Sequence, residues 1–312
     1  INYMPELPEV EVVKKSLQKE ISNLTIKDVK IKDSNLRYKV KRQDLNKIVG
    51  LKILKIKRRS KYLLFFFEMN ILMLFHLGMT GKFFVVDKDR IKQRTSFYYK
   101  VEDSSEKHNR LIFTFTNNLQ LIYHDVRKFG FVKIDLANNI DKNIHLKFLG
   151  PEPFDNFFNF KYFKDYLIGK NRSIKELLMD QKFVSGLGNI YVNEILFLSK
   201  IKPEKNIKKI SNNEIRKIVL FTKIVLKKSI KLGGSSIKDF KDSSGNRGKF
   251  QQKFNVYNKE GIRCPTRNCN NLIKNVQPFF ADLHTGGIGI AHNGNLCNAR
   301  HLRKELVKNG SI

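Results

Sequence analysis

The stretch YLLFFFEMNILMLFHL, residues 62–77, comes nearer than any other part of the chain to a membrane-spanning run. It contains Glu68 and His76 and therefore lacks the roughly 18 uncharged apolar residues of a transmembrane helix. It divides instead into two runs of β-like composition, residues 62–68 and 71–76. This stretch therefore predicts strands of a folded domain.

Short β-like runs continue on both sides, from about residue 26 to residue 134. They are bounded by turn signals such as Gly78 and Asn117-Asn118. The further runs are residues 52–57, 82–86, 111–116 and 119–124. Short strands separated by turns predict a sandwich or barrel-like sheet domain.

Helical patterns flank this sheet region. Residues 5–21 open with a proline and carry one apolar stripe, formed by Leu7, Val10, Val13, Leu17 and Ile21. Pro151 and Pro153 mark a boundary, after which helical periodicity runs to about residue 232. The expected fold class is α+β.

The chain is strongly basic. Its 60 Lys and Arg against 29 Asp and Glu give a net charge of +31, which favours polyanionic partners such as nucleic acid. An AT-rich genome would also enrich Lys, Asn, Ile and Phe without selection for binding. Three cysteines do not make a disulfide framework, and the amino end has no export signal, so we expect a reducing cytoplasm.

The motif MPELPEVE, residues 4–11, suggests chemistry at the amino end. A proline behind an initiator methionine is commonly exposed when that methionine is removed. The free nitrogen of Pro5 titrates near pH ~8, so part of it is neutral and nucleophilic at neutral pH. It could attack a sugar C1′, and Glu6 could move the protons. Ordinary helix-start chemistry explains the same residues.

The same motif resembles the amino-terminal signature of the formamidopyrimidine-DNA glycosylase family, and further resemblances follow in order to about residue 274. RRSKYLL, residues 58–64, resembles the segment that carries the family's catalytic-site lysine, here Lys61. The resemblance implies an amino-terminal β-sandwich with one helix, followed by a helical DNA-binding domain.

Two loops resemble the family's DNA wedge. The turn HLGMTG, residues 76–81, supplies Met79, and the loop HDVRKFG, residues 124–130, supplies Arg127 and Phe129. In the family, such residues fill the gap left by a base that has left the stack, which costs a few kcal/mol to extrude. Val126 and Lys128 stand where the family usually has proline and arginine. Taken singly, Met79 and Phe129 would more often be core residues.

The helical segment carries a capping-box pattern at Ser173 and Glu176. GLGNIY, residues 186–191, then breaks one helix and starts another that runs to about Lys200. It resembles the family's helix–two-turn–helix element, in which the residue matching Asn189 grips the DNA backbone. A plain helical hairpin would explain the glycines equally well. Residues 233–257 resemble the loop that closes over the everted base.

The resemblance breaks near the carboxyl end. The family ends in a hairpin clamped by four cysteines around zinc, and here Cys264 and Cys269 supply half of that set. Residues 276–312 instead resemble an internal piece of the glutaminase domain of amidophosphoribosyltransferase, without its cysteine nucleophile. A splice near Asn275 is the simplest explanation: a gene fusion, a frameshift or an assembly error.

The resemblance implies a bifunctional glycosylase and lyase acting on oxidised purines in double-stranded DNA. The expected domains are residues 4–135 (catalytic β-sandwich), 150–235 (helix–two-turn–helix), 236–274 (base-capping loop and truncated, incomplete zinc hairpin) and 275–312 (foreign fragment). We expect a monomer in the bacterial cytoplasm, associated with the nucleoid, with no organic cofactor. Two alternatives remain: a non-catalytic damaged-DNA-binding protein, because residues 1–3 block Pro5 and the hairpin is truncated, and an inert fragment that never folds past Leu272.

Overall fold

The computed structural model describes residues 4–87, 92–94, 106–234, 254–257, 259, 279–283 and 286–290. The chain forms two compact units, and each is described by itself. The first contains Ile1–Asn159, Asp180–Leu187 and Thr222–Gln252. The second contains Phe160–Met179, Gly188–Phe221 and Lys253–Ile312.

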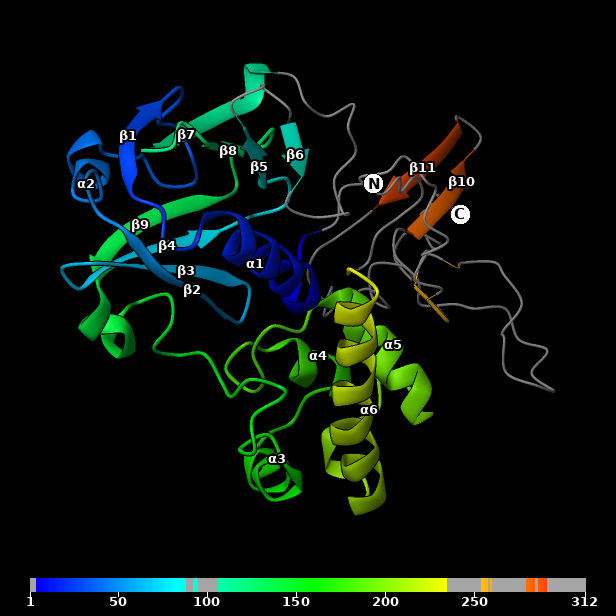
Figure 1. Ribbon diagram of the computed structural model, residues 1–312. Helices are drawn as coiled ribbons and strands as arrows, with labels where there is room; N and C mark the ends of the chain where they lie inside the picture. Colours follow the sequence, from blue (N-terminus) through cyan, green and yellow to red (C-terminus); the bar gives the residue numbers. More distant parts are fainter. Residues whose placement is uncertain are drawn as a thin grey trace. The chain divides into compact units, whose positions relative to one another are not determined.

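Figure 1 labels the helices and strands in chain order. The helices are α1 (Leu7–Ile21), α2 (Arg42–Asn46), α3 (Phe160–Leu167), α4 (Ile174–Met179), α5 (Asn189–Ser199) and α6 (Asn212–Lys231), with 3-10 turns η2 (Glu106–His108), η3 (Ala137–Lys142) and η4 (Ile207–Lys209). The strands are β1 (Ile26–Ile31), β2 (Ile53–Arg59), β3 (Tyr62–Phe67), β4 (Ile71–His76), β5 (Lys82–Val86), β6 (Lys92–Arg94), β7 (Asn109–Phe115), β8 (Gln120–His124), β9 (Phe131–Leu136), β10 (Phe279–Leu283) and β11 (Gly286–Ile290).

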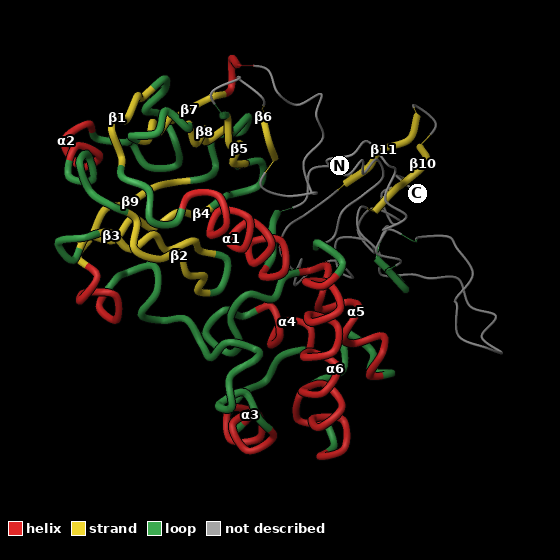
Figure 2. Tube along the Cα trace, in the orientation of Figure 1, coloured by secondary structure: helices red, strands yellow, loops and turns green. Residues whose placement is uncertain are grey.

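Two antiparallel sheets build the first unit. One has the strand order β1-β7-β8-β5-β6 and the other the order β2-β3-β4-β9. Figure 2 shows both sheets in yellow, with α1 beside them. One core cluster joins their facing sides, with Phe65 and Phe75 from one sheet and Phe83 and Phe113 from the other. The predicted sandwich is therefore confirmed.

Helix α1 adds its apolar stripe to this core. All five predicted stripe residues are buried, and four of them, Val10, Val13, Leu17 and Ile21, belong to the core cluster between the sheets. The helix begins at Leu7, two residues later than the pattern predicts, because Glu6 is its N-cap with extended backbone (φ −96°, ψ −173°). Pro5 consequently lies before the helix.

Strands β3 and β4 explain why the opening stretch is so continuously apolar. Phe65 and Phe75 face the core between the sheets, whereas Leu64 and Leu74 face a second cluster that includes Phe131 and Leu146. A strand buried on both faces has no polar face and reads as an unbroken apolar run.

Most of the predicted runs are strands in the structure, with ends that differ by one or two residues. β1 and β9 were not recognised as separate runs, because each buries only two side chains, Ile26 and Val29 in β1 and Phe131 and Val132 in β9. Their place is set by pairing with β7 and β4, which lie far away in sequence.

The second unit is helical. The capping box before α4 is confirmed, since the Ser173 amide donates to the Glu176 carboxylate (2.8 Å) and the Glu176 amide donates to the Ser173 hydroxyl (3.2 Å). α5 follows Gly188 as its N-cap and ends at Lys200, which adopts a left-handed conformation. α6 contributes its first part to this unit and its remainder to the first.

β10 pairs with β11 in an antiparallel hairpin, with Phe279 opposite Ile290. The rest of the segment 275–312, on which most of the predicted glutaminase resemblance rests, lies outside the described residues. Among the helices that the structure describes, none combines the length and apolar character needed to cross a membrane.

Candidate active site

The amino end of α1 holds the first two predicted site residues. Glu6 is buried and forms a capping box with Glu9: its side chain accepts from the Glu9 amide, and its own amide donates to Glu9 Oε2 at 2.9 Å. Pro5 is buried directly before it. The capping box therefore fixes the backbone conformation of Glu6 and, through it, the position of Pro5.

Gly186 contacts this helix start. The Leu7 amide donates to the Gly186 carbonyl at 3.0 Å. Gly186 has φ +92°, and a Cβ there would lie 2.6 Å from Leu7 Cδ1. Gln181 holds Gly186 and Leu187 in place by accepting from the Gly186 amide (2.8 Å) and donating to the Leu187 carbonyl (2.7 Å). Sequence reasoning interpreted Gly186 and Gly188 only as a helix break and missed this role of Gly186.

Lys61 lies in the two-residue turn between β2 and β3, where Arg59 pairs with Tyr62. Its neighbour Ser60 is buried and has φ +55°. The Ser60 amide donates to Glu152 Oε1 at 2.6 Å, and its carbonyl accepts from Arg58 at 2.8 Å. Hydrogen bonds to both the amide and the carbonyl of Ser60 therefore fix the turn that contains Lys61.

Arg58, Arg59, Glu11 and Glu152 form the network that holds this turn. Arg58 donates to both Glu152 oxygens (3.1 and 2.7 Å) and to Glu11 on α1 (2.9 Å). Arg59 donates to Glu152 (3.2 Å) and to the Leu149 and Gly150 carbonyls (2.9 and 2.6 Å). The network thus ties the Lys61 turn to the helix that carries Glu6. The sequence motif gave no signal for Glu152, which lies 91 residues after Lys61.

The charges of Lys61 and Glu6 interact. Burial lowers the pKa of the Lys61 ammonium below its ordinary value, while the negative charges of Glu6 and Glu9 raise it in part. Desolvation of a cationic lysine favours its neutral form. Lys61 can therefore exchange a proton or serve as a cation according to what binds beside it.

His76, at the end of β4, was missed as a site residue although it opens the HLGMTG motif. Its ring stacks on Phe131 (centroids 5.6 Å apart) and lies 5.0 Å from the ring of Tyr62. Burial first and the charge of Lys61 second lower its pKa to about 4, so the ring is neutral at neutral pH. Its Nδ1 accepts from the Gly78 amide at 3.1 Å, which leaves Nε2–H as a donor.

Asp125 organises the loop that carries Arg127 and Phe129. Its buried carboxylate accepts from the Thr80 hydroxyl, the Tyr123 hydroxyl (3.2 Å) and the Gly130 amide (2.8 Å). The Arg127 amide donates to the Thr80 hydroxyl at 2.9 Å. The loops of Met79 and Phe129 are thus joined by one hydrogen-bond network.

Arg127 and Phe129 of this loop have exposed side chains. Phe129 is 45% exposed, so it is not a core residue, and the Arg127 guanidinium lies 4.7 Å from its ring centroid. Met79 is partly buried. Lys128, at the position where the family usually has arginine, has φ +59° and contacts Asp33 at 2.8 Å.

Replacing Gly78 by alanine should lower the free energy of unfolding by roughly 3 kcal/mol, from left-handed strain and overpacking together. Gly78 has φ +61°, and a Cβ there would lie 2.5 Å from the Gly130 amide nitrogen. Gly50 provides the matched control, since its φ is +82° but nothing lies within 4 Å of a Cβ. Thermal unfolding of both variants separates strain from the clash, and equal losses would contradict this packing of the two loops.

Asn189 belongs to the second unit, at the first turn of α5. The same helix carries Glu194, which sequence reasoning missed. Its buried carboxylate accepts from the amides of Asn255, Val256 and Tyr257 (2.8, 2.9 and 3.0 Å) and from the Asn255 side chain (2.9 Å). Glu194 is the only charged residue of the helix NIYVNEILFLS, and this was the available signal.

The zinc prediction rests on residues that lie outside the described part, Cys264 and Cys269. Within the described residues no group of three or more metal-ligating side chains gathers. The sequence offers only Cys297 as a further thiolate, whereas structural zinc takes four ligands. These residues do not fit the family's four-cysteine site, and no step below is assigned to zinc.

Comparison with known proteins places the chain among DNA glycosylases. The model of the formamidopyrimidine-DNA glycosylase N-terminal domain matches residues 4–132, and that of the H2TH domain of the same enzymes matches residues 149–241. The formamidopyrimidine-DNA glycosylase of Rickettsia bellii (strain OSU 85-389) is 38% identical over 261 residues, 84% of this chain and 90% of the relative. That of Rhodopseudomonas palustris (strain ATCC BAA-98 / CGA009) is 36% identical over 270 residues, 84% and 92%.

Solved structures agree with this assignment. Lactococcus lactis Fpg in complex with DNA containing an abasic site is 33% identical, with a TM-score of 0.73, and the match covers 92% of this chain and 97% of that one. Its complex with DNA containing FAPY-dG matches equally, with a TM-score of 0.73 and 92% and 98% covered. The chain therefore belongs to the formamidopyrimidine-DNA glycosylase family.

Proposed function

We propose that this protein is a base-excision DNA glycosylase with lyase activity that removes oxidised purines from double-stranded DNA. One observation supports the proposal most strongly: the carboxylate of Glu6, the N-cap of α1 directly after Pro5, interacts electrostatically with the Lys61 ammonium of the β2–β3 turn. Relatives and solved structures of the same family support the reaction class.

Pro5 is the proposed nucleophile, once the residues before it are removed. Its secondary amine attacks the sugar C1′, and the bond from C1′ to the base breaks, with a proton delivered to the departing base. The attached amine loses its proton, and the bond from C1′ to the ring oxygen then breaks, with a proton delivered to that oxygen, so that an iminium forms between C1′ and Pro5. The resulting iminium acidifies C2′, whose proton is lost as the 3′ phosphate leaves. Water then hydrolyses the iminium and frees the proline. Glu6 is the proposed acid and base in these transfers.

Lys61 and His76 are proposed to hold the sugar and the phosphate at the lesion. Lys61 supplies a cation or a proton, and the neutral His76 supplies an Nε2–H donor. Donors held in fixed positions stabilise charge that develops on oxygen without reorganising during the reaction. In the second unit, Asn189 and the amides at the start of α5 are proposed to bind phosphate.

Met79, Arg127 and Phe129 are the proposed wedge. The exposed ring of Phe129 and the side chain of Met79 would fill the space left by the extruded base, and Arg127 would hydrogen-bond the orphaned partner base. Unstacking a base costs a few kcal/mol, which apolar contacts of this kind offset. The Asp125 network holds these loops before DNA binds.

The proposed organisation follows the domains expected from the sequence, with catalysis in residues 4–135 and backbone binding in residues 150–235. The protein would act as a monomer on chromosomal DNA in the bacterial cytoplasm. No glutaminase activity is assigned to residues 275–312, because the nucleophile of such enzymes is absent.

A panel of duplexes tests the substrate class. Protein starting at Pro5 should nick duplexes containing 8-oxoguanine opposite cytosine, or a formamidopyrimidine, faster than duplexes containing an oxidised pyrimidine. Single-turnover strand cleavage on denaturing gels measures this. Faster cleavage of the oxidised pyrimidine would contradict the purine assignment, and binding without cleavage of any lesion would contradict the enzymatic one.

A further inference from the structure

A strip of ring contacts extends from the proposed active site within the first unit, with the buried Phe131 at its centre. From His76 it continues through Phe131 to His145, with centroids 5.6 and 4.7 Å apart. Tyr38 joins at its far end, 5.0 Å from Phe131 and 5.8 Å from His145. The strip therefore begins at His76, which is proposed to bind the sugar and phosphate at the lesion.

Exposed cations border this strip. Lys133 Nζ lies 4.8 Å from the Tyr38 ring centroid. Burial lowers the pKa of His145, and the charges of Lys133 and Arg37 lower it further. Arg37 precedes Tyr38 in the chain, and its amide donates to the Gly130 carbonyl (3.1 Å), next to Phe131. Both cations are thus neighbours of the rings although their side chains are exposed.

Lys133 and Arg37 differ from some other cations of this unit in lacking a carboxylate partner among the described residues. Within the described part of the chain, Arg37 and Lys133 form no ion pair with a carboxylate. By contrast, Lys128 and Arg110 both contact Asp33 (2.8 Å each). Exposed cations that lack a carboxylate partner and lie beside aromatic rings can bind the phosphates of a nucleic acid.

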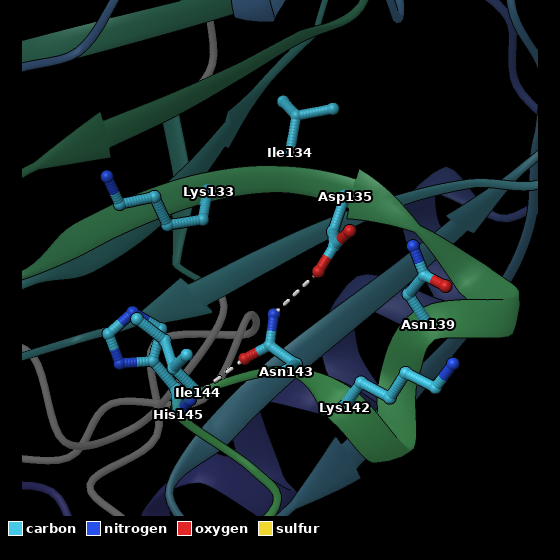
Figure 3. A pocket seen from close by; sticks show the side chains of 8 residues that line it. All are labelled: Lys133, Ile134, Asp135, Asn139, Lys142, Asn143, Ile144 and His145. Carbon is cyan, nitrogen blue, oxygen red and sulfur yellow. Dashed lines mark hydrogen bonds between the residues drawn. The ribbon is translucent and has the colours of Figure 1, made fainter.

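A hollow of about 460 Å³ continues the strip beyond His145. Figure 3 shows Lys133 and His145 toward one end of it and Lys142 toward the other. The one carboxylate in the lining is held by its neighbours: Asp135 accepts from the Asn143 side chain and the Leu136 amide, at 2.8 Å each. With Lys133 and Lys142 against this one carboxylate, the charge of the lining is positive on balance.

We propose that Arg37, Lys133 and His145 form a second subsite for the DNA backbone, which binds phosphates of the substrate duplex away from the lesion. The proposal rests on the proposed function, because the duplex that reaches this subsite is the one held at Lys61 and His76. Lys133 and Arg37 supply charge, and His145, neutral at neutral pH, supplies a hydrogen bond. The aromatic rings give the strip a rigid floor.

The double variant R37Q/K133Q tests this subsite, with K19Q/K27Q as the matched control. Lys19 and Lys27 are exposed lysines of the same unit, so the control loses the same charge. Fluorescence anisotropy on a lesion duplex, from low to high salt, gives the slope of log affinity against log salt. Each lost phosphate contact reduces that slope by roughly one, so R37Q/K133Q should lose about two and the control none.

Neutral methylphosphonate linkages placed one at a time along the duplex locate the contact. Wild-type protein should lose affinity at one or two linkages away from the lesion, where R37Q/K133Q shows no further loss. Equal slopes for the two double variants, or no linkage that couples to R37Q/K133Q, would overturn the subsite. Wild-type protein that binds with this coupling but cleaves no lesion would instead overturn the proposed function and leave the subsite standing.

Discussion

Replacing Glu6 by glutamine should lower the single-turnover rate of base release by about 10²–10⁴-fold, the usual contribution of a positioned acid or base. Glutamine keeps an acceptor oxygen for the Glu9 amide, so the capping box at the start of α1 is retained. It cannot carry the transferred proton. The variant also removes a charge that raises the pKa of Lys61, which favours the neutral amine further.

The control for this variant is E20Q, which makes the same chemical change near the end of α1. Both proteins should unfold at nearly the same temperature, and E20Q should cleave an 8-oxoguanine duplex as wild type does. A fully active E6Q protein would contradict the assignment of proton transfer to Glu6.

Replacing Glu152 by alanine should lower the free energy of unfolding by about 3 kcal/mol, because the buried Arg58 guanidinium loses one of its two carboxylate partners and keeps only Glu11. Arg58 is 8% exposed and donates to both Glu152 oxygens, and the Ser60 amide would also lose its acceptor. Chemical denaturation measures the loss. The surface pair of Lys47 and Asp44, 55% and 44% exposed, provides the control, since D44A should cost at most about 1 kcal/mol.

This stabilisation should also depend on pH. Burial by itself raises the pKa of Glu152, but the charge and hydrogen bonds of Arg58, with the Ser60 amide and Arg59, lower it below its ordinary value. The contribution is therefore complete above the unfolded pKa of about 4.3 and is lost as the pH falls through the folded pKa. The difference between wild type and E152A should shrink in that acidic range, and a difference that grew on acidification would contradict the ion pair.

Local patterns predicted the parts of the fold that depend on short-range periodicity. The α1 stripe and the fully apolar β3 and β4 could be identified because burial leaves a regular mark on composition. β1 and β9 could not, since each has only two buried side chains and its place is set by pairing with a strand far away in sequence.

The residues of the candidate site also fall into those that short motifs predict and those that only long-range contacts define. Glu6, Lys61, Met79, Arg127 and Phe129 were predicted because each lies within a short motif. Glu152 and Glu194 were not, because their importance arises from hydrogen bonds to residues 61 to 94 positions away in the chain. Asp125 was quoted within a motif, yet its role depends on Thr80, 45 residues earlier.

Borohydride trapping on a duplex with one 8-oxoguanine opposite cytosine tests the central claim most directly. Protein begun at Met4 with the methionine removed is compared with the chain of residues 1–312. The account predicts a covalent adduct only with the free Pro5 nitrogen, because in the longer chain that nitrogen is an amide. Equal adducts with both proteins would contradict Pro5 as the nucleophile, and no adduct with either, despite retained DNA binding with a steep salt dependence, would establish the non-catalytic alternative.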